Sequence, residues 1–69
     1  MTKANIVMFD KLEDWTRQGQ WPRRWIWFRG FGSVTLQEYC QAIWVSVGRG
    51  DGRTFSAAAR RALESVEEA

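Results

Sequence analysis

Histidine is absent from the 69-residue sequence, and cysteine occurs once, as Cys40. Without histidine the chain lacks the side chain that most often serves as a general base near neutral pH, and it cannot assemble a His/Cys metal cluster. A single cysteine excludes an internal disulfide. These absences predict a protein that is not an enzyme, that uses no cofactor or structural metal and that folds in a reducing compartment.

Long apolar runs are also absent. The first apolar stretch, residues 6–9, is shorter than the roughly 7–15 residues of a signal-peptide core, and the run 25–28 is far shorter than the roughly 20 residues of a membrane span. The sequence therefore predicts a single domain over 1–69 that is cytoplasmic and has no membrane partner. Because so small a core supplies only about 3–5 kcal/mol, a partner protein or a homodimer is the expected outside support.

The chain is unusually rich in tryptophan, and its arginines are unevenly distributed. There are five tryptophans, and the modest net charge of +2 conceals two basic segments, 21–32 and 49–61, in which the positive charge is all arginine. A guanidinium group binds carboxylates and phosphates and stacks on aromatic rings. A domain of this size struggles to bury five indoles, so we expect some of them to remain exposed as a binding surface.

Hydrophobic spacing predicts three elements: a helix over 5–18, a strand over 23–31 and a helix over 55–67. Asn5 and Thr54 are the expected N-caps of the two helices, and the glycine-rich segment 48–52 is expected to be a loop. The fold class that follows is α+β, a small two-layer α-β-β-α sandwich in which helices pack on an antiparallel sheet of two or three strands.

Residues 33–47 are compatible with two structures. A capping box at 35–38 would begin a helix that continues to Val47. A strand over 39–47 is the alternative, and we favour it because three of the last five residues are β-branched.

The segment 21–29 interleaves tryptophan with arginine, and its alternation places Trp25, Trp27 and Arg29 on one face of the strand. Such residues are enriched at the energetic centres of protein interfaces, and they also stack on unpaired bases. A structural interpretation, in which arginine packs on tryptophan beside a buried face, competes with both. We predict that Trp25, Trp27 and Arg29 form a partner-binding surface whose rim comprises Arg23, Arg24, Arg49 and Arg53.

The closing segment carries a resemblance. It reads WVSV at 44–47, GDGRT at 50–54 and AAARRAL at 57–63. This order resembles the ends of small phage-encoded αββα sandwich proteins, and antitoxins of the HicB type and double-stranded-RNA-binding-like domains end similarly. The resemblance covers about residues 39–66 and brings no catalytic or ligand-binding residue with it.

The resemblance implies a function by class. Very small phage proteins, among them the anti-CRISPR inhibitors, commonly bind and block a host protein, so the expected partner is a host complex such as a CRISPR effector. The alternative is a nucleic-acid-binding or antitoxin-like module that uses the same arginines. The low net charge and the acidic C-terminal segment weigh against that alternative.

Overall fold

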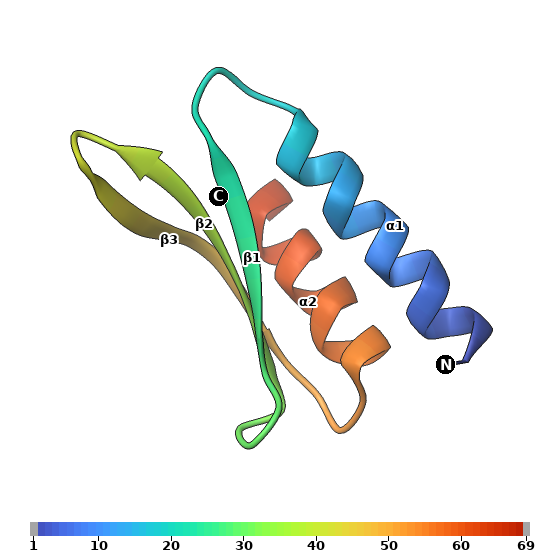
Figure 1. Ribbon diagram of the computed structural model, residues 1–69. Coiled ribbons are helices and arrows are strands. Elements are labelled where there is room, and N and C mark those ends of the chain that lie inside the picture. The colour runs from blue at the N-terminus through green and yellow to red at the C-terminus, as the bar shows by residue number, and fades with distance from the viewer. Residues whose placement is uncertain (1, 69) are drawn as a thin grey trace.

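The computed structural model describes residues 2–68, which form a helix, three strands and a second helix. The elements are α1 (Lys3–Arg17), β1 (Arg23–Phe28), β2 (Ser33–Cys40), β3 (Ile43–Asp51) and α2 (Phe55–Glu68). The strands make one antiparallel sheet in the order β1-β2-β3, and both helices lie on the same side of it (Figure 1). The predicted two-layer α+β architecture is confirmed, with three strands in the sheet.

The core lies between the sheet and the two helices. Leu12 of α1 and the β2 residues Val34 and Leu36 are completely buried. The whole core cluster comprises Met8, Leu12, Trp15, Val34, Leu36, Ala58, Ala59 and Ala62. Three of its eight members are the small alanines of α2, so this helix lies close to the sheet, as its alanine stripe predicts.

The glycines of β3 allow this close approach. Gly48 and Gly50 are both buried, and a methyl group added at Gly50 would overlap the backbone of Ala58 and Ala62. The predicted loop over 48–52 is therefore wrong in extent, because β3 continues to Asp51. The glycines are there to let α2 rest on the strand rather than to turn the chain.

The segment between residues 33 and 47 forms neither of the two structures expected for it. It contains β2, a two-residue turn at Gln41 and Ala42, and the first half of β3. Both turn residues have positive φ, 53° and 69°, as the hairpin turn that matches the twist of the flanking strands requires. Neither glutamine nor alanine signals such a turn, so the hairpin is not evident from local sequence.

The helix starts illustrate one wrong and one correct prediction. Helix α1 begins at Lys3, and its cap is Thr2, whose hydroxyl accepts a hydrogen bond from the Asn5 backbone N–H at 3.2 Å. Asn5 is therefore inside the helix. The Thr54 hydroxyl accepts from the Ala57 N–H at 3.2 Å, which confirms it as the cap of α2.

The strained turn gives a stability prediction. The left-handed conformation costs a non-glycine residue about 1–2 kcal/mol, so Ala42→Gly should raise the free energy of unfolding by about 0.5–1 kcal/mol after the added chain entropy is subtracted. Urea denaturation measures this change. The same substitution at Ala4, inside α1, should lower stability by up to about 1 kcal/mol. Effects of the same sign at the two positions would contradict the turn geometry.

Candidate functional site

The two faces of the sheet differ in what covers them. The pairs Trp25↔Leu36 and Trp27↔Val34 lie on the helix side, whereas Arg24↔Gln37 and the pairs that alternate with them point the other way. Neither α1 nor α2 covers this second side (Figure 1). We call it the open face; its side chains are Arg24, Ile26, Phe28, Ser33, Thr35, Gln37, Tyr39, Trp44, Ser46, Arg49 and Asp51.

Side chains from all three strands interact across the open face. The Arg24 guanidinium lies over the Trp44 ring, 4.1 Å from its centroid, and its Nε donates to Gln37 Oε1 at 2.7 Å. Gln37 Nε2 donates in turn to Ser46 Oγ at 3.4 Å. The Tyr39 and Trp44 rings are 5.2 Å apart and tilted by 58°. We refer to these five residues as the Arg24–Trp44 cluster.

The cluster is exposed and held in place at the same time. Tyr39 and Trp44 are 39% and 36% exposed, values that are high for large aromatic side chains. The stacking and the hydrogen bonds fix the guanidinium and the indole before any partner arrives, which lowers the entropy lost on binding.

The open face is weakly basic. None of the ion pairs in the described part of the chain includes Arg24. Arg49, further along the same face, pairs with Asp51 at 3.3 Å in an exposed contact. Glu38 points to the helix side, where it binds Arg23. A partner surface that carries a carboxylate opposite Arg24 would complement this face.

Trp25 and Trp27 occupy a different place from the one predicted for a free surface. Both pack against the core on the helix side, half-buried, with Phe55 rings 5.6 Å from each indole. Trp25 also meets Phe9 edge-on at 5.5 Å, and its Nε1 donates to Glu13 Oε1 at 3.0 Å. These contacts give both indoles a structural role.

Arg23 also contributes to structure. Its Nε contacts Glu38 Oε2 at 2.8 Å, its Nη1 donates to the Trp15 carbonyl at 3.1 Å, and its guanidinium lies 4.6 Å from the Trp15 ring centroid. This side chain ties the sheet to the end of α1.

The remaining predicted arginines fall into two groups. Arg24 and Arg49 lie on the open face. Arg29 and Arg53 are exposed on two loops that lie side by side, joined by the hydrogen bond from the Gly52 N–H to the Gly32 carbonyl at 2.8 Å. The structure thus divides the predicted single surface among the helix side, the open face and one end of the sheet.

Sequence reasoning missed Tyr39, Gln37 and Trp44 as members of the site. A strand running without interruption through 39–47 would place Tyr39 and Trp44 on opposite faces. The turn at 41–42 reverses the chain, so the two rings become cross-strand partners on one face. Only the position of this turn could have revealed the pair.

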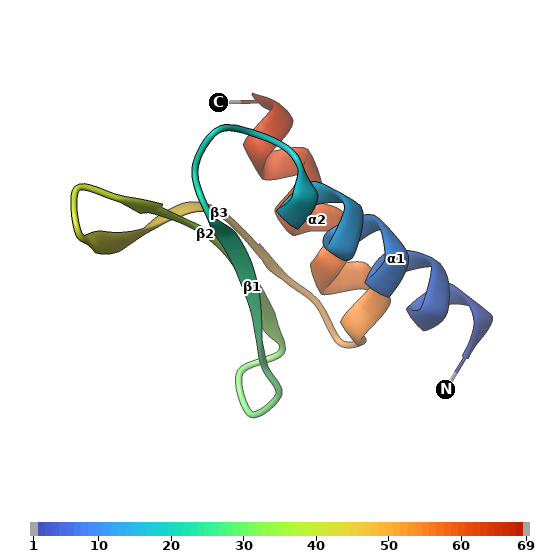
Figure 2. The same ribbon diagram turned by 45° about the horizontal axis from the view of Figure 1, so that its top comes forward.

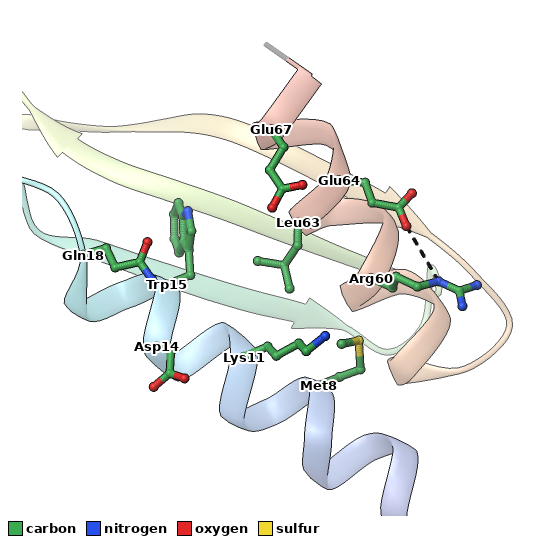
Figure 3. Close-up of a pocket in the computed structure, with 9 residues that line it drawn as sticks. All are labelled: Met8, Lys11, Asp14, Trp15, Gln18, Arg60, Leu63, Glu64 and Glu67. Carbon is green, nitrogen blue, oxygen red and sulfur yellow. Dashed lines mark ion pairs between the residues drawn. The ribbon is translucent and has the colours of Figure 1, made fainter.

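One of the concave features of the molecule is a groove between the two helices (Figure 3). It encloses about 540 Å³, and Leu63 of α2 and Lys11 of α1 point toward the space between the helices. Its lining residues are Met8, Lys11, Asp14, Trp15, Gln18, Arg60, Leu63, Glu64 and Glu67. Cations and carboxylates are mixed along it, so its charge selects neither an anionic nor a cationic ligand.

Residues 2–68 contain no group of three or more potential metal ligands, and neither of their helices has the length and apolar character needed to cross a membrane. Comparisons of the chain with protein-family models, curated proteins and solved structures gave no match. The resemblance of residues 39–66 to small phage proteins therefore stays a prediction.

Proposed function

We propose that the protein binds a partner protein through the open face of its sheet and acts by occupying part of that partner's surface. The observation that carries the proposal is the Arg24–Trp44 cluster on the side that neither α1 nor α2 covers, in which an exposed indole is fixed beside an arginine that has no carboxylate partner among the described residues. Exposed, preorganised tryptophan, tyrosine and arginine side chains are typical of interface hot spots.

A protein suits this face better than a single-stranded nucleic acid does. Bases stack on a free ring face, but Arg24 covers the Trp44 ring, and Tyr39 is tilted against it at 58°. Nucleic acid binding also draws on several unpaired cations, whereas Arg49 on this face is already paired with Asp51.

The more specific proposal is an inhibitor of phage type whose partner is a host protein complex, such as a CRISPR effector. It rests on the small size of the domain and on the resemblance of residues 39–66, and it agrees with a surface that offers binding groups. Such an inhibitor needs only to cover a working surface of its target.

The test compares single substitutions on the two sides of the molecule. Trp44→Ala and Arg24→Ala should each weaken partner binding at least about tenfold, as expected for hot-spot residues. Lys11→Ala, in the groove between the helices, is the matched control and should bind normally. Quantitative capture from host lysate identifies the partner, titration calorimetry with the purified partner gives the affinities, and thermal unfolding confirms that each variant is folded.

Two results would contradict the proposal. Normal binding by folded Trp44→Ala and Arg24→Ala would place the interface elsewhere. Binding of single-stranded RNA or DNA that weakens log-linearly with salt and depends on Arg24 would favour the nucleic-acid alternative.

A further inference from the structure

The outer edge of β3 lacks charged residues and proline, two of the features that usually prevent strands from pairing between molecules, and its one irregularity, the bulge at Val47, lies at the end of the segment considered below. Residues 39–48 contain no charged side chain and no proline, and β3 is an outer strand of the sheet. The hairpin that carries Ile43–Ser46 extends away from both helices (Figure 2). All four of these residues are exposed, so their edge is free to pair.

The free backbone groups of this edge can be assigned from one hydrogen bond. The Tyr39 N–H donates to the Pro22 carbonyl at 2.8 Å, on the side away from β3. Tyr39 is the cross-strand partner of Trp44, and opposed residues in an antiparallel pair either bond each other or both point outward. The N–H and C=O of Trp44 therefore point to the free edge, as do those of Ser46 two residues later.

We propose that this edge pairs with the same edge of a second copy of the chain. Trp44 and Ser46 flank Val45 symmetrically, so an antiparallel pairing about a two-fold axis at Val45 sets Trp44 of each copy opposite Ser46 of the other. Both residues then exchange N–H···O=C bonds, four in all across the pair. The two sheets join into one of six strands.

The side chains favour the second copy over an unrelated strand. Val45, which is 41% exposed, faces its own counterpart on the helix side, where Ile43 lies opposite Val47 of the second copy. Only the residue on the two-fold axis faces its own counterpart, so a charged side chain there would be repelled; position 45 is valine, and residues 39–48 carry no charge near the axis. The pairing uses backbone groups at the edge of β3, whereas the proposed function uses side chains of the open face, where Arg24 and Tyr39 of both copies stay accessible. The dimer therefore does not depend on the proposed function.

Sedimentation of the full chain from micromolar to millimolar concentration tests the proposal. The mass should rise from the 8.1 kDa of the chain toward twice that value. Ser46→Pro removes one outward N–H per copy and should weaken the dimer at least about tenfold, because proline leaves the bonds to β2 intact but cannot donate at the edge. Ser46→Ala keeps that N–H and should dimerise like the original chain.

A second pair of variants covers the case in which the proline variant fails to fold. Val45→Lys places two like charges opposite each other and should abolish the dimer. Val7→Lys, at a valine of nearly equal exposure (43%) on α1, should leave it unchanged. A chain that is monomeric at every concentration, or a dimer that persists in folded Val45→Lys, overturns the proposal, as does a dimer lost in Val7→Lys alone.

Discussion

Replacing Gly50 by alanine should remove most of the protein's stability. The added methyl group would overlap the backbone of Ala58 and Ala62 and would lie 2.7 Å from the carbonyl carbon of Arg61. Backbone atoms cannot rotate aside as a side chain can, so α2 would have to move away from β3 and uncover the alanines of the core. The expected loss of about 3 kcal/mol is comparable to the whole stability of a domain this small.

Gly30→Ala is the matched control for this substitution. Nothing lies within 4 Å of a methyl group at Gly30, in the turn between β1 and β2. Its stability should stay within about 0.5 kcal/mol of that of the original chain. Far-ultraviolet circular dichroism and urea denaturation distinguish the two variants. A Gly50→Ala protein as stable as Gly30→Ala would show that α2 does not rest on the β3 backbone.

The same glycines show why the sequence predicts the elements better than their limits. The stripe of alanines identifies α2 from the sequence because helical periodicity is a local property. Gly48 and Gly50 indicate a loop on the same local reasoning, since glycine most often marks a turn. Their actual role is to leave space for α2 to pack against β3. This role depends on where α2 packs and cannot be predicted from neighbouring residues.

The division of the predicted binding surface has a similar cause. Alternation along β1 correctly separates Trp25 and Trp27 from Ile26 and Phe28. Both faces of the strand carry rings, however, so the pattern does not say which face the helices cover. The packing of Phe9 and Phe55 decides it, because these rings bring the helices to the tryptophan side.

The expected surplus of tryptophan is confirmed. Trp15 is buried at 7% exposure and Trp25 and Trp27 are half-buried, whereas Trp21 and Trp44 remain 55% and 36% exposed. The exposed tryptophans are therefore Trp21 and Trp44, not Trp25 and Trp27 as the sequence predicts. Composition limits how much aromatic surface a small core can cover, but the topology selects which rings stay outside.

Arg23→Ala should lower the free energy of unfolding by about 2–3 kcal/mol, even though Arg23 and Arg24 are adjacent arginines. The Arg23 and Glu38 side chains are only 17% and 26% exposed, so removal of the guanidinium leaves a half-buried carboxylate without its partner. The Trp15 carbonyl loses its side-chain donor as well. Thermal and urea unfolding measure the loss, and Arg24→Ala on the open face should cost less than about 1 kcal/mol.

Glu38→Gln in the Arg23→Ala background separates the two contributions to this loss. If the unpaired carboxylate is the main cost, neutralising it should restore about 1 kcal/mol, whereas the contacts with Trp15 would stay lost. Equal destabilisation by Arg23→Ala and Arg24→Ala would contradict the assignment of the two residues to opposite faces. Alternation in β1 places the two neighbouring arginines on opposite faces of the sheet. Arg23 binds α1, whereas Arg24 lies on the open face and is available to a partner.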